Sequence, residues 1–162
     1  MKASLATSEP ARLQLWKKEG LEKRVLEKAR QGKQKFILHD GPPYANGHIH
    51  IGHALNKVLK DMIVRYKTLT GHKTIYIPGW DCHGLPIEHA LFKELGKNKD
   101  DVDQVEFRKS ARKYASKFIK IQKKEFQRLG AFGEWDTPYL TMSARYQAAI
   151  AKSFYELYEK GY

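Results

Sequence analysis

The sequence contains a single cysteine, Cys82, among its 162 residues. One thiol excludes an internal disulfide framework and any zinc knuckle built from Cys-x-x-Cys pairs, and it favours a reducing compartment. No apolar run approaches the roughly 18 residues that a membrane span requires, and the N-terminal segment lacks the apolar block of a secretory signal peptide. These absences predict a soluble, cytoplasmic protein with no membrane partner.

Acidic residues are also few. Lys and Arg number 30 against 18 Asp and Glu, which gives a net charge of +12. Such an excess favours phosphate-bearing partners, either nucleotides or nucleic acid. With 41% hydrophobic and 12% aromatic residues the chain can form a globular core, and its length corresponds to one domain. Composition therefore predicts a basic globular domain but does not choose among the phosphate-bearing partners.

The hydrophobic periodicity of the first hundred residues predicts helices alternating with short strands. Because strand, helix, strand and helix follow one another, we expect an α/β fold with a parallel sheet and crossover helices. Residues 96–104 are polar and read as a loop. The expected elements are a helix over 10–31 that runs through Gly20, a strand over 36–40, a helix from Gly52 to Gly71, a strand over 74–79 and a helix over 85–96.

The helix that starts at Gly52 has the clearest pattern. Its apolar residues recur at the spacing of one helix face, and Asp61 and Arg65 stand four apart as an ion pair. That face comprises Leu55, Val58, Leu59, Met62, Tyr66 and Leu69. Further on, the sequence predicts a long helix over 105–129, a third strand within 137–141 and a last helix capped by Ser143.

The segment from Gly41 to His53, GPPYANGHIHIGH, joins a strand end to a helix start. Ligands of open α/β folds bind at this edge of the sheet. Gly47 and Gly52 allow a ligand to approach the backbone, and the helix N-terminus attracts an anion. His50 and His53, three residues apart, could both reach a phosphate. The alternative is structural, with one histidine capping the helix and the other packed in the core.

A metal site is a competing interpretation of the same histidines. His48, His50 and His53 form HxHxxH, which resembles the HxHxDH zinc motif of metallo-β-lactamase-like hydrolases. Gly52 occupies the position of that motif's Asp, and no downstream spacing fixes the remaining ligands. These would have to come from Asp81, Cys82, His83 or His89. We therefore predict no metal site.

The second informative segment is PGWDCHGLPIE, residues 78–88, which also follows a strand and precedes a helix. In a parallel sheet it faces the same edge as the histidine segment. Asp81 could receive an ammonium group there, with Trp80 as an apolar wall. Alternatively, Asp81 caps a turn and Trp80 fills the core. Cys82 has no fixed base beside it, so we do not expect a cysteine nucleophile.

The predicted helix between Glu106 and Leu129 carries nine basic residues against two acidic ones. A basic stripe of this kind can follow a nucleic-acid backbone. It can equally be a solvated helix face, which is the commoner outcome of a charge run. Lys109, Arg112, Lys113, Lys120 and Lys124 lie near one face of this helix.

The motifs together resemble a known family. HIHIGH within PPYANGHIHIGHALNK is similar to the HIGH signature of class I aminoacyl-tRNA synthetases, which His50 to His53 match letter for letter. Methionine enzymes of this class share a similar PYANG loop, leucine enzymes have a related GWD segment, and valine enzymes differ at both. PYANG, GWDCHGLPIE and LGAFGEWDTPYLTM in one chain resemble the bacterial-type isoleucyl-tRNA synthetases, from about residue 10 to the end.

The resemblance implies the N-terminal half of a Rossmann-like, parallel-sheet nucleotide-binding domain over residues 35–162, preceded by a helical extension over 1–34. It implies activation of isoleucine by ATP with Mg²⁺ and transfer to isoleucine tRNA, with no protein-bound zinc in this segment. The implied roles are contact with ATP phosphates for the catalytic pair His50 and His53, nucleotide approach for Gly47 and Gly52, amino-acid binding for Pro42 and Asp81, and tRNA contact for Arg112, Lys113 and Lys120.

The sequence also departs from that family. Its enzymes are several times longer, and no KMSKS-type segment occurs here. We therefore expect the chain by itself to be inactive in aminoacylation. Two alternatives stay open: a stand-alone basic RNA-binding module that keeps the fold without the chemistry, or a synthetase of the same class for methionine, leucine or valine.

Overall fold

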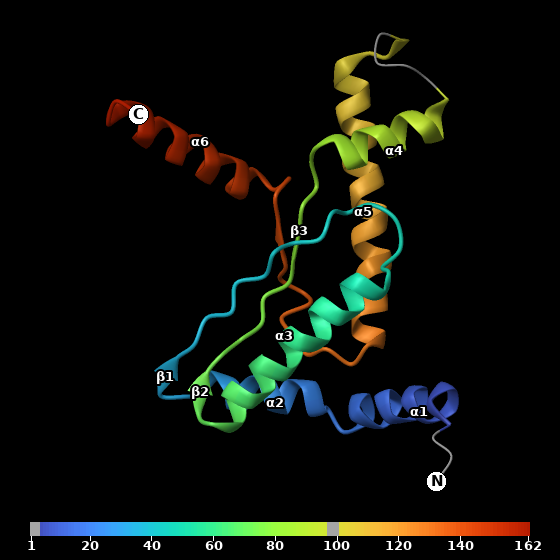
Figure 1. Cartoon of the computed structure of the whole chain (residues 1–162), viewed down its shortest axis with the longest axis vertical. Helices are drawn as coiled ribbons and strands as arrows, with labels where there is room; N and C mark the ends of the chain where they lie inside the picture. Colours follow the sequence, from blue (N-terminus) through green and yellow to red (C-terminus); the bar gives the residue numbers. More distant parts are fainter. Residues whose placement is uncertain (1–3, 97–100) are drawn as a thin grey trace. The chain divides into compact units, whose positions relative to one another are not determined.

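A computed structural model describes residues 4–96 and 101–162, and Figure 1 shows its elements in chain order. The strands are only two residues long, whereas the helices have 10 to 25 residues. Helices are α1 Leu5–Lys18, α2 Leu21–Arg30, α3 Ile51–Leu69, α4 Leu85–Leu95, α5 Gln104–Arg128 and α6 Ala144–Glu159. Strands are β1 Gln34–Lys35, β2 His72–Lys73, β3 Gly79–Trp80 and β4 Tyr139–Leu140.

Four of the predicted helices are confirmed, and their ends carry the expected capping residues. Gly96 ends α4 in the left-handed conformation, and Ser143 accepts a hydrogen bond from the Tyr146 amide at the start of α6. The single helix over 10–31 is wrong. Gly20 has φ 61° and separates α1 from α2, since a left-handed glycine ends a helix. Residues 97–100 of the predicted loop lie outside the described part of the chain.

The parallel pairing of strands is confirmed, but their positions are wrong. In the described residues β1 pairs with β2 and β3 with β4, all in parallel. Residues 36–40, predicted as a strand, follow β1 as an extended segment in which more buried and exposed residues alternate. The predicted strand at 74–79 is replaced by β2 before it and β3 at its end. The third strand is confirmed at its centre as β4.

The chain divides into two compact units. The first contains residues 1–40, 49–77 and 122–136 and therefore includes α1, α2, α3, β1, β2 and the end of α5. Its core is mainly aromatic, and the rings of Phe126 and Trp135 stack with centroids 6.3 Å apart. Buried apolar residues of this unit are Ala29, Val64, Tyr76, Phe126, Ala131, Phe132 and Trp135.

The second unit contains residues 41–48, 78–121 and 137–162. Trp80 of β3 is fully buried, and β4 packs beside it without obstruction because Gly79 has no side chain. A Cβ at Gly79 would lie 2.0 Å from the ring of Tyr139. Other buried apolar residues include Ala45, Cys82, Ile87, Leu91, Tyr114, Ala115, Ile119 and Met142. In the described chain, no helix is both long and apolar enough to cross a membrane.

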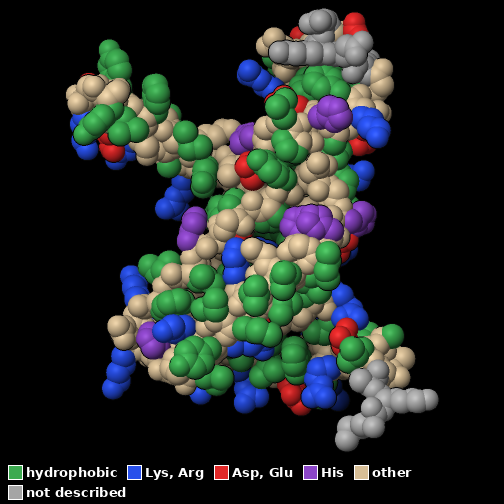
Figure 2. Space-filling view, in the orientation of Figure 1, with side chains coloured by type: hydrophobic (Ala, Val, Ile, Leu, Met, Phe, Trp, Pro, Cys, Tyr) green, Lys and Arg blue, Asp and Glu red, His purple; other side chains and the backbone are tan. Residues whose placement is uncertain are grey.

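The apolar face predicted for α3 is not the buried one. Leu55 and Met62 are 62% and 61% exposed, and Figure 2 shows hydrophobic side chains gathered over this helix. The buried side of α3 instead carries Lys57, Val64 and Thr68. Spacing alone selected the wrong face, because Lys57 is paired with the buried carboxylate of Asp40.

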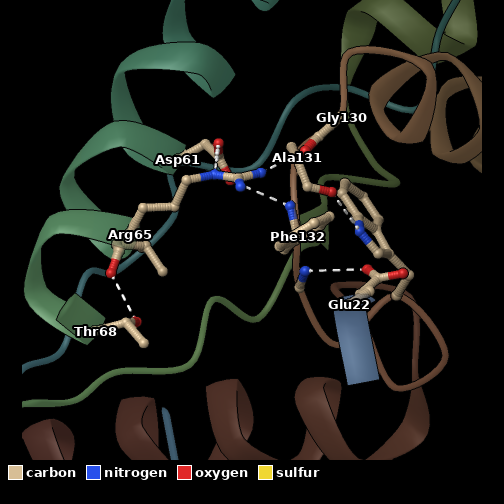
Figure 3. Close-up of polar contacts among 10 residues, drawn as sticks. Glu22, Asp61, Arg65, Thr68, Gly130, Ala131 and Phe132 are labelled. Atoms are coloured by element: carbon tan, nitrogen blue, oxygen red, sulfur yellow. Dashed lines mark hydrogen bonds and ion pairs between the residues drawn. The ribbon is translucent and has the colours of Figure 1, made fainter. Parts of the chain in front are cut away.

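The predicted ion pair between Asp61 and Arg65 is confirmed at 2.5 Å. Both residues also form hydrogen bonds with the segment that follows α5 (Figure 3). Arg65 donates to the Gly130 carbonyl at 2.7 Å, and its guanidinium lies 4.1 Å from the ring centroid of Phe132. Asp61 accepts a hydrogen bond from the Phe132 amide at 3.2 Å. Glu22 of α2 accepts one from the Gly133 amide at 3.5 Å. Residues 130–133 are thereby held against both α2 and α3.

Candidate active site

His50 and His53 lie together at the start of α3, with ring centroids 4.0 Å apart. Each ring caps the helix. His50 Nδ1 accepts from the Gly52 amide at 3.1 Å, and His53 Nδ1 accepts from the His50 amide at 3.3 Å. A Cβ at Gly52 would approach the His50 ring to 3.0 Å, so glycine makes room for this arrangement. Both histidines therefore cap the helix, whereas the structural alternative assigned capping to one of them and core packing to the other.

Capping fixes which nitrogen of each ring carries the proton. Because Nδ1 accepts a hydrogen bond in both rings, each neutral imidazole has its hydrogen on Nε2. Partial burial, then the neighbouring His50 and Lys57, lower the pKa of His53, which favours the neutral ring. The pair can thus present two Nε2–H donors at a helix N-terminus, where an anion is also attracted by the helix dipole.

The end of α5 supports the segment that carries this pair. Glu125 Oε2 accepts a hydrogen bond from the Ile49 amide at 3.0 Å, immediately before His50. Phe126, the next residue, meets the His53 ring edge-on with centroids 6.3 Å apart. Two consecutive residues of α5 therefore fix the backbone before the pair and one of its rings.

A buried charge cluster lies one turn further along α3. Lys57 Nζ donates to Asp40 Oδ2 and to the Tyr76 hydroxyl, both at 2.5 Å, and Lys60 Nζ donates to Asp40 Oδ1 at 2.5 Å. The Tyr76 hydroxyl donates to Asp40 Oδ2 at 2.8 Å. Burial alone raises the pKa of Asp40, but the two ammonium groups and the hydroxyl outweigh it and lower this pKa. Helical spacing did not reveal this cluster, because it favours burial of the opposite, apolar face of α3.

Asp81 and Pro42 belong to neighbouring extended segments of the second unit. The Asp81 amide donates to the Pro43 carbonyl at 2.9 Å, and Tyr44 and Asp81 form a parallel bridge. Asp81 Oδ1 accepts from the His83 amide at 3.2 Å and from Thr141 Oγ1 at 3.3 Å. Oδ1 therefore caps the turn, as the structural alternative predicts. Oδ2 makes no hydrogen bond within the described residues and is available for an ammonium group.

The residues on either side of Asp81 are structural. Trp80 is 0% exposed and fills the core, which is the structural alternative stated for it. It does not form an open apolar wall beside Asp81. Burial raises the pKa of the Cys82 thiol, whose Sγ lies 3.5 Å from the Trp80 carbonyl oxygen. A buried thiol of this kind is a poor nucleophile.

The other predicted site residues lie in the second unit. Gly47 has φ 69°, a left-handed conformation that favours glycine. Arg112, Lys113 and Lys120 are exposed on α5 and form no ion pair within the described residues. They line a shallow depression together with Lys109, Ser116 and Lys117.

The two units thus divide the predicted site. His50, Gly52 and His53 belong to the first unit, whereas Pro42, Gly47 and Asp81 belong to the second, as do the three basic residues of α5. Among the described residues no group of three or more His, Cys, Asp or Glu side chains could hold a metal ion. His48, the third member of HxHxxH, contacts Phe118 in the second unit, with centroids 6.4 Å apart.

Comparison with known proteins gives long matches. The chain is 54% identical to the isoleucine–tRNA ligase of Caldicellulosiruptor saccharolyticus over 162 residues, which are all of this chain and 18% of that protein. It is 54% identical to the enzyme of Natranaerobius thermophilus, again over the whole chain and 17% of the relative. With the enzyme of Desulfotalea psychrophila it shares 56% identity over 155 residues, or 95% of this chain and 16% of that one. The chain therefore spans less than a fifth of these relatives.

A solved structure resembles the fold. It is the crystal structure of a ternary complex of LeuRS from Agrobacterium radiobacter with tRNA and LeuAMS. The similarity has a TM-score of 0.72 at 28% identity and covers 99% of this chain and 18% of that one. The family described as tRNA synthetases class I (I, L, M and V) matches residues 11–162. This match covers both histidines, the Asp81 segment and α5, and the chain belongs to that family.

Proposed function

We propose that this chain supplies part of the active site of an ATP-dependent isoleucine–tRNA ligase of the cytoplasm. The observation that carries the proposal is the pair of histidines that cap α3. Each ring accepts from a backbone amide through Nδ1, so its Nε2–H group points away from that amide. In this proposal residues 35–162 are the first half of the Rossmann-like catalytic domain, and residues 1–34 are a helical extension. The chain's 51–56% identity to isoleucine–tRNA ligases supports isoleucine as the amino acid.

The reaction begins when the isoleucine carboxylate oxygen attacks the α-phosphorus of ATP. A bond forms between that oxygen and phosphorus, the bond to the β-phosphate oxygen breaks, and pyrophosphate leaves. Negative charge increases on the phosphoryl oxygens in the transition state. Two preorganised Nε2–H donors of His50 and His53 stabilise this charge, because they need no reorientation when it develops. The aminoacyl group then moves to the terminal adenosine of tRNA and AMP leaves.

Other residues bind and orient the substrates. Asp81 Oδ2 receives the isoleucine ammonium group, while Oδ1 keeps the turn in place through His83 and Thr141. Pro42 lies on the adjacent segment. In this proposal Mg²⁺ accompanies ATP and is bound by its phosphates. Gly47 leaves the backbone open to the nucleotide, and Gly52 leaves room for the His50 ring. The basic face of α5 contacts tRNA phosphates.

The test uses a chimera, defined as the Caldicellulosiruptor saccharolyticus enzyme with its matching segment replaced by residues 1–162. In this chimera we expect His50→Ala or His53→Ala to slow isoleucine-dependent pyrophosphate exchange by about 10²-fold or more, the scale for one lost preorganised donor. ATP affinity should change far less. His48→Ala is the matched control, because this neighbouring histidine packs on Phe118 and does not belong to the capping box of α3, which His50 and His53 form.

Three results would contradict the proposal. An equal loss of ATP binding and of exchange would remove the transition-state role of the pair. Exchange with leucine, methionine or valine in place of isoleucine would assign a different amino acid. A chimera that binds tRNA normally but shows no exchange with any of the four would favour the RNA-binding module.

A further inference from the structure

The charged pair beneath the histidines is almost completely withdrawn from water. Lys57 is 4% exposed and Asp40 1%. Lys57 uses its ammonium group on two partners, the Asp40 carboxylate and the Tyr76 hydroxyl. Withdrawing an ammonium group from water is costly, and burial accordingly lowers the pKa of Lys57 while Asp40 opposes this change. A salt bridge on the protein surface would avoid this desolvation cost, so the burial of the Lys57 ammonium group needs another explanation.

The position of Lys57 relative to His53 provides one. The two residues stand four apart on α3, which places them on the same side of successive turns. Both contact the fully buried Phe126 ring. The Lys57 ammonium nitrogen lies 5.0 Å from its centroid, and the His53 ring lies 6.3 Å from it, centroid to centroid. The Lys57 ammonium and the His53 ring therefore contact the same buried apolar ring.

We propose that Lys57 is a positioning residue of the histidine pair, whose buried positive charge keeps His53 as the neutral ring that accepts through Nδ1 and donates through Nε2. This inference deepens the proposed function and rests on it. An imidazolium at position 53 would carry a proton on Nδ1 and could no longer accept from the His50 amide. The cap would open, and the two donors would lose their shared orientation.

The other charged and titratable groups near His53 are few. His50, from the segment before α3, acts in the same direction as Lys57 and disfavours a second positive charge. Glu125, from α5, would favour an imidazolium, but its Oε2 is engaged by the Ile49 amide. Lys60 lies two turns from His53 and binds the other oxygen of Asp40. Lys57 is thus the group that combines a fixed charge with contact to the same buried ring.

Histidine NMR on the ¹⁵N-labelled 162-residue chain tests the proposal without any assay of activity. In the wild-type chain we expect His53 to be the Nε2–H tautomer and to titrate below 6.5, the ordinary pKa of histidine. Lys57→Gln, which keeps a donor but removes the charge, should move the midpoint of the His53 titration upward by about half a pH unit or more. Lys57→Arg should restore most of the wild-type midpoint.

Lys60→Gln is the matched control, because it also keeps a donor and removes a charge from the same carboxylate, but two helical turns from His53. A comparable shift in this variant would overturn a specific role for Lys57. A folded Lys57→Gln chain with an unchanged midpoint would also overturn it. If Lys57→Gln fails to fold, the wild-type tautomer still decides: an Nδ1–H ring contradicts the proposal and an Nε2–H ring supports it.

Activity in the chimera separates this inference from the proposed function. Lys57→Gln should raise the lower pH limit of pyrophosphate exchange in step with the His53 midpoint, with little change in the KM for ATP. The expected NMR shift in a chimera with no exchange activity would leave the role of Lys57 intact and reject the proposed function. Normal exchange with an unchanged pH limit would reject the role of Lys57 alone.

Discussion

Asp40 links the free energy of unfolding to pH. Its pKa is lowered in the folded chain, so the folded state binds a proton there less readily than the unfolded state. The stabilisation is therefore present above the ordinary pKa of 3.8 and is lost as the pH falls through the lower folded value. Asp40→Asn leaves the Lys57 ammonium buried without its counter-charge and should cost about 3 to 5 kcal/mol at pH 7.

Urea unfolding of wild type and Asp40→Asn at a series of pH values measures this difference. The gap between them should begin to narrow below about pH 4, where Asp40 of the unfolded wild-type chain takes up a proton, and should close only below the lower folded pKa. A gap that stays constant from pH 7 to pH 3 would mean that hydrogen bonding, and not charge, gives Asp40 its effect.

A substitution at Asp81 can separate the effect of its negative charge from its effect on the turn. Asn keeps the oxygen that accepts from the His83 amide and Thr141, so Asp81→Asn removes the negative charge with little change to the turn. In the chimera the KM for isoleucine should rise by an amount equivalent to roughly 2 to 5 kcal/mol, because the substrate ammonium loses its partner. The KM for ATP should stay near its original value.

Thr141→Val provides the comparison, since it disturbs the turn and leaves the charge. If Thr141→Val raises the isoleucine KM as much as Asp81→Asn does, the carboxylate only shapes the turn.

Helices were predictable from the sequence where a terminal residue marks the end, whereas the ends of strands were not. Ser143 and Gly96 mark helix ends through their own local chemistry. Gly20 carried the same signal, and the apolar spacing that continues past it concealed the break. Strand ends depend on a partner distant in sequence. The amide of Phe36 pairs with Lys73, so β1 ends where β2 ends, and no pattern within residues 36–40 contains that information.

The same distinction between local signals and distant partners holds for the candidate site. Asp81 directly follows a strand end, and the histidines stand beside glycine at a helix start. Both are local signals. The buried Lys57 was not predictable, because its burial depends on Asp40 and Tyr76, which are 17 and 19 residues away.

Helix α5 allows a test of the proposed tRNA interface at the level of one element. Basic residues along a helix contact phosphates and carry little sequence information. Replacing Arg112, Lys113 and Lys120 by Gln should reduce the salt dependence of tRNA binding by the chimera, by roughly one unit of slope for each lost contact. Isoleucine activation should be unaffected.

A matched triple variant on the first two helices controls for net charge. Lys17, Lys18 and Lys28 are equally exposed, and replacing them by Gln removes the same three charges from α1 and α2. An equal change of slope in both triple variants would assign the effect to overall charge and return α5 to a solvated face.

The whole chain carries the proposed catalytic histidines and an exposed apolar surface on α3. Stabilisation of a transition state depends on all its donors acting together, and the family's KMSKS segment is not in this sequence. We expect the 162-residue chain to show no charging of isoleucine tRNA. The exposed face of α3, with Leu55, Leu59 and Met62, should also promote self-association.

Sedimentation velocity over a range of concentrations measures the association, and charging assays on the monodisperse fraction measure activity. Leu59→Lys with Met62→Lys should shift the distribution toward monomer. Robust charging that is lost in the His50→Ala, His53→Ala double variant would show that these 162 residues suffice.

Cys82 gives this chain a built-in kinetic probe. The sequence has one thiol, and the fold buries it in the second unit with 5% exposure. A thiol reagent can modify it only when that unit opens, so the rate of modification reports the free energy of a local opening reaction. Asp40 lies in the other unit. Modification of Cys82 that becomes faster in Asp40→Asn would therefore mean that the two units open in one cooperative step, and an unchanged rate would mean that they open independently.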